Sequence, residues 1–126
     1  MTSKAQALYK FWSQFGLPCF DEHTIPSGDV SPSLPYITYE AATDKFEGRL
    51  PLTASIWDRS SSWQSVEAKA EEISRAINEH GYWIKKYSWG YLQIYGRTPF
   101  AQRMSDPDDG IRRMGINITA EFFSAY

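Results

Sequence analysis

The residues best equipped for chemistry are three neighbours, Asp21, Glu22 and His23. Carboxylates and an imidazole can bind a metal ion or exchange protons near neutral pH. Successive side chains of an extended chain point in alternating directions, however, so these three cannot all face one centre. The only other histidine, His80, does not form a second cluster with them. We interpret the trio as part of a solvated loop, and a small enzyme ranks last among the functions considered.

Other groups with reactive side chains have simpler structural explanations. The run Ser60–Ser62 lacks the glycines of a nucleophile elbow and is expected to cap a helix. The segment Asp106–Gly110 lacks the length and the late glutamate of a calcium loop, so it predicts a tight turn. His80 follows the main predicted helix, where a protonated imidazole would stabilise the helix dipole. We therefore predict no enzyme activity, no cofactor, no metal and no small-molecule ligand.

Composition indicates an ordinary globular domain. The chain has 126 residues, with 42% apolar and 22% charged residues and a net charge of −2. This length suits a single domain spanning residues 1–126, and the charge argues against binding to nucleic acid or membranes through overall charge. Cys19 is the only cysteine, which excludes an intrachain disulfide and fits a reducing compartment. No signal peptide or membrane span is predicted, so we expect a protein that assembles from the cytosol.

Aromatic residues are abundant, with five Trp, eight Tyr and seven Phe. Aromatic rings stabilise both cores and protein interfaces, and so small a domain has limited room to bury all of them. We therefore expect some rings to contact other chains. A thick aromatic core is the alternative, and composition alone does not decide between the two.

Hydrophobic periodicity predicts an α+β fold with the order α-β-β-α-β-β-β. Helices are expected over 3–15 and 62–80, and a mostly antiparallel or mixed sheet carries both of them on one face. Ser61 and Gln64 suggest a capping box at the second helix, with Ser60 and Ser62 as competing caps. Residues 17–34 are interpreted as a long irregular segment that is functional or ordered by a neighbour. The predicted strands are 36–41, 50–59, 82–87, 91–97 with a continuation at 100–105, and 111–123.

Several side chains are candidates for a protein interface. Residues 50–59 alternate as a strand, which places Trp57 and Arg59 on the face opposite the core. A tryptophan on that second face should be covered by another element or by a partner. The first helix has an apolar stripe that includes Tyr9, and Phe11 lies off this stripe, so Phe11 could contact a second surface. The full set of interface candidates is Phe11, Trp57, Arg59, Trp89, Tyr91, Arg97 and Tyr126.

Basic residues on the C-terminal strands suggest an alternative of a different class. Together with Tyr87, Trp89 and Tyr91 they could form a surface that binds single-stranded nucleic acid. Lys85 and Lys86 must point to opposite faces of their strand, however, and so must neighbouring Arg112 and Arg113, which splits the cluster. Charges that protect a sheet edge, or that pair between subunits, explain these residues equally well.

Several short segments of the sequence resemble those of a known family. These are Phe15–Phe20 followed by the Ile25-Pro26 pair, then Leu34–Glu40 and Leu52–Trp63. They are similar to the tail terminator proteins of long-tailed bacteriophages, also called tail-completion or minor capsid proteins. Local sequence similarity covers roughly residues 8–80. The remainder of the chain is similar only in the order of its secondary-structure elements.

This resemblance implies a structural protein of the virion tail or neck that is assembled in the host cytoplasm. It implies a self-associating chain that forms a homohexameric ring, ends polymerisation of the tail tube protein and presents its other face to head-completion or neck proteins. The family has no residue motif from which functional residues of this chain could be assigned. A head-closure or adaptor protein of the neck is the neighbouring alternative within the same class.

Overall fold

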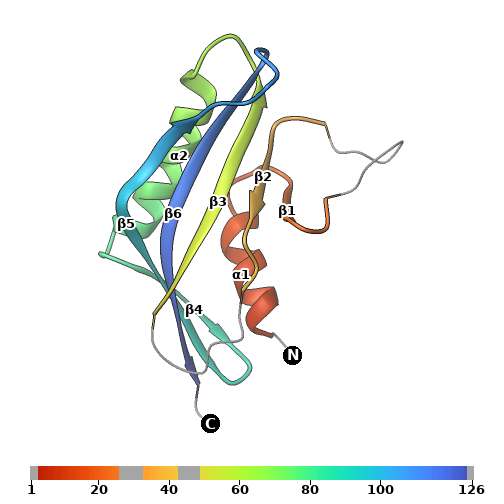
Figure 1. The fold of residues 1–126 in the computed structure, drawn as a ribbon. Coiled ribbons are helices and arrows are strands. Elements are labelled where there is room, and N and C mark those ends of the chain that lie inside the picture. The colour runs from red at the N-terminus through yellow and green to blue at the C-terminus, as the bar shows by residue number, and fades with distance from the viewer. Residues whose placement is uncertain (1–2, 26–32, 43–48, 125–126) are drawn as a thin grey trace.

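The computed structural model describes residues 3–25, 33–42 and 49–124. Two helices and six strands make up this part of the chain (Figure 1). In chain order they are α1 (Lys4–Ser13), β1 (Cys19–Asp21), β2 (Tyr36–Tyr39), β3 (Arg49–Arg59), α2 (Gln64–Asn78), β4 (Trp83–Tyr87), β5 (Gly90–Met104) and β6 (Ile111–Ser124).

The strands form one mixed sheet in the order β1-β2-β3-β6-β5-β4. All neighbours are antiparallel except β1 and β2, which run parallel. The predicted α+β class is therefore confirmed. Strand β1 is an addition to the predicted order, because it lies inside the segment 17–34 that was interpreted as irregular.

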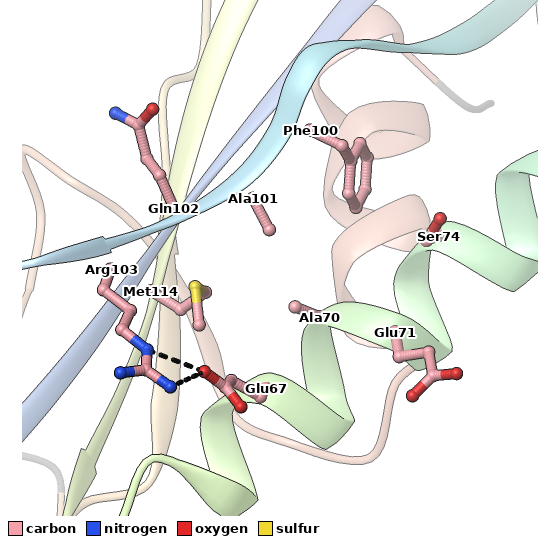
Figure 2. A pocket seen from close by; sticks show the side chains of 9 residues that line it. All are labelled: Glu67, Ala70, Glu71, Ser74, Phe100, Ala101, Gln102, Arg103 and Met114. Carbon is pink, nitrogen blue, oxygen red and sulfur yellow. Dashed lines mark hydrogen bonds and ion pairs between the residues drawn. The ribbon is translucent and has the colours of Figure 1, made fainter.

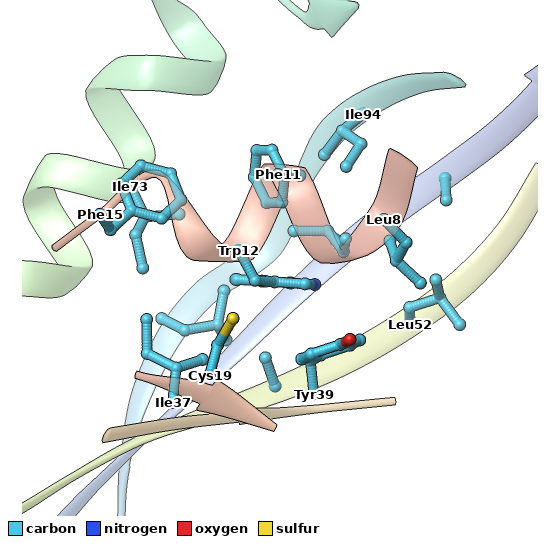
Figure 3. Packing of buried hydrophobic residues seen from close by; sticks show 14 of the residues in the cluster. Leu8, Phe11, Trp12, Phe15, Cys19, Ile37, Tyr39, Leu52, Ile73 and Ile94 are labelled. Carbon is cyan, nitrogen blue, oxygen red and sulfur yellow. The ribbon is translucent and has the colours of Figure 1, made fainter. Parts of the chain in front are cut away.

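The core lies between one face of the sheet and both helices. Side chains from β2, β3, β5 and β6 alternate inward and meet the buried residues of α1 and α2 in a single cluster. Figure 3 shows Trp12 of α1 over the strand residues Ile37 and Tyr39, with Phe11 on the other side of the helix. The inward face of β6 consists of Met114, Ile116, Ile118, Ala120 and Phe122.

Helix α1 begins with a capping box, since Ser3 and Gln6 exchange hydrogen bonds between side chain and backbone. Its buried stripe differs from the predicted one. Tyr9 is 48% exposed, whereas Phe11 is 0% exposed and makes edge-to-face contacts with Trp12 and Trp83. The hypothesis that Phe11 contacts a second surface is therefore wrong, because β4 brings Trp83 against that side of the helix.

Helix α2 buries Val66, Ala70, Ile73 and Ile77 against the sheet. Its N-terminus differs from the predicted capping box on Ser61. The hydroxyl of Ser62 accepts from the Gln64 N–H at 3.1 Å, and no side chain caps the helix from Trp63. Ser62, one of the two competing caps, thus orders the approach to α2 in place of Ser61.

Strand β5 continues through residues 100–104 as the extension that the sequence suggested. Its pairing with β6 shifts register between Gly96 and Ala101, which accommodates Pro99, a residue without an N–H to donate. The predicted turn between β5 and β6 is confirmed. Within it, Asp108 accepts from the Gly110 N–H at 2.8 Å.

Candidate protein interface

The face of the sheet opposite the helices carries a row of large side chains across four strands. Phe20 on β1, Tyr36 on β2, Trp57 on β3 and Arg113 on β6 follow one another along this row. Phe20 and Tyr36 meet edge to face at 5.8 Å, and Tyr36 lies 6.4 Å from Trp57 between ring centroids. The Arg113 guanidinium lies 4.5 Å from the centroid of Trp57. We call these four residues the aromatic row.

Two small polar residues are buried beneath the aromatic row. Thr38 and Ser55 are each 5% exposed although they lie on the face without helices. The Trp57 Nε1–H donates to Thr38 Oγ1 at 2.9 Å, and the Arg113 Nε–H donates to Ser55 Oγ at 3.0 Å. The face of Trp57 that was expected to need a cover is thus covered in part by Arg113 of its own chain.

A second group of large apolar side chains lies on the same face at the other end of the sheet. Ile84, Tyr91 and Phe123 are 48%, 47% and 43% exposed. Tyr91 is directly opposite Phe123, and Lys86 of β4 is directly opposite Tyr91. Apolar side chains this exposed on three adjacent strands are typical of a surface that meets another protein. We call Ile84, Tyr91 and Phe123 the apolar patch.

Ordered contacts border the apolar patch. Arg49 pairs with Glu121 at 3.7 Å, and its guanidinium lies 4.9 Å from the Tyr95 centroid. Tyr95 in turn lies 6.4 Å from Tyr82, which is itself 40% exposed. These contacts order the Tyr82 and Tyr95 rings beside the patch, which lowers the entropy that those two rings lose when a partner binds.

An open groove lies on the helix side, between α2 and β5. Figure 2 shows Phe100, Ala70 and Met114 at its apolar floor and the Glu67–Arg103 ion pair at one end. The Trp63 ring lies 5.0 Å from the Arg103 guanidinium and 5.4 Å from that of Arg112. These cationic contacts join the start of α2 to the β5–β6 hairpin.

The remaining interface candidates are dispersed over the surface. Arg59 pairs with Asp108 at 3.3 Å and thereby ties β3 to the β5–β6 turn. The hydrogen bond from the Gly110 N–H, and after it the Arg59 guanidinium, lower the pKa of Asp108. Trp89 lies in the β4–β5 turn and is 51% exposed, and Arg97 is exposed beside the register shift of β5. Tyr126 lies outside the described residues.

The residues considered for binding single-stranded nucleic acid do not form one common surface. Tyr87 is 2% exposed and packs edge to face against Phe122, so its ring is not available for base stacking. The predicted split of the basic residues is confirmed, because Arg112 contacts Trp63 and Arg113 contacts Trp57 on the opposite face.

The structure also bears on the trio Asp21, Glu22 and His23. Asp21 Oδ1 accepts from the His23 N–H at 3.0 Å, and Glu22 lies 3.5 Å from the imidazole. Within residues 3–25, 33–42 and 49–124, no three His, Cys, Asp or Glu side chains gather as metal ligands. No helix in the same ranges is long and apolar enough to span a bilayer.

Two ionisable groups are buried in the core below α1. Desolvation raises the pKa of Cys19 to about 11. Desolvation is also the main cause that raises the pKa of Tyr39 to about 12, with smaller contributions from Cys19, Asp21 and Tyr9. Both groups are therefore neutral at physiological pH, and the thiol is a packing residue with little thiolate character.

Sequence reasoning identified one residue of the aromatic row and one of the apolar patch, but it did not identify either surface as a whole. Trp57 and Tyr91 were named as candidates, whereas Phe20, Tyr36, Arg113, Ile84 and Phe123 were missed. Strand alternation already separated Arg113 from Arg112, and the same argument could have placed Ile84 and Phe123 on the second face. The pairing of β1 with β2, which completes the aromatic row, had no comparable signal.

Comparisons with known proteins give one informative likeness. No protein-family model matches the chain, and no curated protein sequence matches it. A chain in the solved structure described as "Virion of native gene transfer agent (GTA) particle" superposes with a TM-score of 0.63 at 16% identity. The match covers 95% of this chain and 94% of that one, so the two share one fold over nearly their whole lengths.

Proposed function

We propose that this chain is a structural subunit of a phage-like particle. Copies of the chain form a ring at the head–tail joint, and this ring ends polymerisation of the tail tube. The observation that carries the proposal is the end-to-end fold likeness to a chain of the gene transfer agent virion. Both chains are covered almost completely, so the likeness extends over nearly the full length of each. The resemblance of several sequence phrases to tail terminator proteins supports the finer assignment.

The surface of the domain supports an assembly role. In the described part of the chain both helices pack on one face of the sheet, and the other face carries the aromatic row and the apolar patch. Rings held by neighbouring contacts suit interfaces with other subunits, since ordering them costs little entropy on association. On this proposal the partners are further copies of the chain in a homohexameric ring, the tail tube protein and a neck protein on the head side.

Deletion of the coding sequence from the genome that encodes this chain tests the proposal. A terminator stops the growth of the tube, so its loss should give tubes of uncontrolled length and heads without tails in negative-stain electron micrographs. Complementation with the wild-type chain should restore tails of uniform length. Particles that keep normal tails and infectivity would refute the assembly role.

The same experiment separates the neighbouring assignment. A head-closure or adaptor protein acts on the portal side, so its loss should leave tubes of normal length that do not join heads. A complementary measurement mixes the purified chain with growing tail tube protein. Shorter tubes with the chain at one end support the terminator assignment, whereas unaffected tubes support the adaptor.

A further inference from the structure

The two edges of the sheet carry opposite charges on short strands. Strand β4, at one edge, carries Lys85 and Lys86. Strand β1, at the other edge, ends at Asp21, and Glu22 follows it directly. Within the described part of the chain, neither lysine has an ion-pair partner. An edge strand presents unpaired backbone groups, so each edge can accept a further strand.

The two edge strands point in the same direction. Strand β1 runs parallel to β2, and the four antiparallel steps from β2 to β4 restore that direction. If the β4 edge of one copy met the β1 edge of the next, the added pair would therefore be parallel. A repeated contact of this type is heterologous, which is the arrangement that generates rings.

The order of side chains matches in the same parallel alignment. Along β4, Ile84 on the uncovered face is followed by Lys85 on the helix face and Lys86 on the uncovered face. Along β1, Phe20 on the uncovered face is followed by Asp21 and then Glu22. Placing Ile84 beside Phe20 brings an apolar pair together and sets each lysine beside an acid on the same face.

The stagger of the two edges is compatible with a closed ring. Phe20 lies level with Gly115 of β6, and Ile84 lies level with Glu121, six residues further along the strand. At about 3.3 Å per residue this offset is about 20 Å, across six strands that span about 29 Å. The ratio corresponds to a strand tilt of about 35° to the ring axis, within the range of closed barrels.

We propose that copies of this chain associate through their sheet edges, β4 of one copy pairing in parallel with β1 of the next. This contact specifies the subunit interface of the ring in the proposed function. Lys85 faces Asp21 of the adjacent copy and Lys86 faces Glu22, while Ile84 packs on Phe20. Within one copy Glu22 lies 3.5 Å from His23, an exposed contact that the lysine would replace.

Charge swapping with sedimentation or mass photometry as the readout tests this contact. The wild-type chain should form a closed oligomer as concentration rises. The variants K85E/K86E and D21K/E22K should each remain monomeric at concentrations where the wild type is assembled. Mixing the two variants should restore assembly with alternating copies, and the quadruple variant should assemble alone, because each edge again meets the opposite charge.

Two further variants control the result. The matched variant E71K/E79K makes the same charge change as D21K/E22K at two exposed positions, one in α2 and one at its C-cap, and should assemble as the wild type does. The variant K85T/K86T distinguishes pairing from edge protection. Under the proposal it weakens assembly, whereas lysines that only protect the edge would make it strengthen assembly.

The outcomes separate this contact from the function it refines. A wild-type chain that is monomeric at every concentration overturns the edge contact. So does an oligomer that both charge reversals leave intact, although such an oligomer still fits a ring built through another surface. The deletion phenotype of the tails is read separately, so the role in the particle can hold where the edge contact fails.

Discussion

The guanidinium of Arg113 stacks over the indole of Trp57, 4.5 Å from its centroid, while the same indole donates to buried Thr38. The two residues are directly opposite one another on β6 and β3. Arginine therefore shields one side of the ring and Thr38 fixes its rotation. Through this relationship the sheet face opposite the helices holds a large side chain in place by contacts within the sheet itself.

Loss of Trp57 should destabilise the monomer moderately. Replacement Trp57→Ala removes the cation–π contact, the hydrogen bond to Thr38 and the packing on Tyr36, which together are worth about 2 kcal/mol in the free energy of unfolding. Replacement Trp57→Phe keeps a ring under Arg113, so we expect a loss of about 1 kcal/mol. Urea denaturation followed by circular dichroism measures both.

Tyr9→Ala is the matched control for this test. Its side chain is 48% exposed on α1, so its loss should change stability by less than about 0.5 kcal/mol. Equal effects of Trp57→Ala and Tyr9→Ala would contradict the role given to the Trp57–Arg113 contact.

Phe11 should behave as a core residue. It is 0% exposed and contacts Trp12, Phe15 and Trp83, so Phe11→Ala should cost about 3–5 kcal/mol of folding free energy. Phe11→Leu leaves a smaller void and should cost about 1–2 kcal/mol. Thermal unfolding gives the order of the three proteins. A stable Phe11→Ala monomer with impaired assembly would instead restore the interface role first expected from the sequence.

Alkaline pH should destabilise the fold through Cys19 and Tyr39. The pKa of Cys19 is raised from 9.0 to about 11 and that of Tyr39 from 10.0 to about 12, so the folded state retains protons that the unfolded state releases. This contribution to stability is complete below the unfolded pKa values. It is lost between pH 9 and about 11 for Cys19, and between pH 10 and about 12 for Tyr39.

Denaturation midpoints measured from pH 8 upward check the sign and the residues. The decline above pH 9 should be shallower in Cys19→Ala, whatever its stability at pH 8. A thiol reagent should react slowly with the native chain at pH 8 and rapidly after unfolding in urea. Rapid reaction of the native protein would contradict the burial of Cys19.

The contrast between Trp57 and Phe11 shows how far the sequence determines the candidate site. Residues 50–59 alternate with period 2, so only one assignment of faces is compatible with the apolar positions, and Trp57 was placed correctly. On α1, two overlapping stripes share Leu8, Trp12 and Phe15, and helical periodicity favours neither. The contact with Trp83 of β4 decides for Phe11, and this contact depends on tertiary structure that local patterns do not contain.

Strand β1 illustrates the second limit of the sequence. Three residues after Pro18 are too short to show a period, and they become a strand only because Cys19 pairs beside Ile37. The edge contact and the Phe20 end of the aromatic row both depend on this pairing. By contrast β6 alternates over its whole length, so its faces follow from the sequence alone.

The two arginines around Trp63 should contribute unequally to stability. Arg103 is largely exposed and pairs with exposed Glu67, so Arg103→Ala should cost under about 1 kcal/mol. Arg112 donates to the backbone carbonyls of Ser61 and Asp109, so Arg112→Ala should cost about 1–3 kcal/mol. Equal costs in urea denaturation would show that the contact with Trp63, which both share, dominates over the hydrogen bonds.

The apolar patch should matter for assembly and hardly at all for folding. Tyr91 and Phe123 are nearly half exposed, so Tyr91→Ser and Phe123→Ser remove little buried area and should each change the free energy of unfolding by about 1 kcal/mol or less. In the complementation experiment, however, the double variant should fail to restore tails of uniform length, because exposed rings gain their burial only from a partner. The control variant Tyr9→Ser removes a comparably exposed ring from α1 and should complement fully. If the patch variant also complemented fully, the partner surfaces would have to lie at the sheet edges or along the aromatic row.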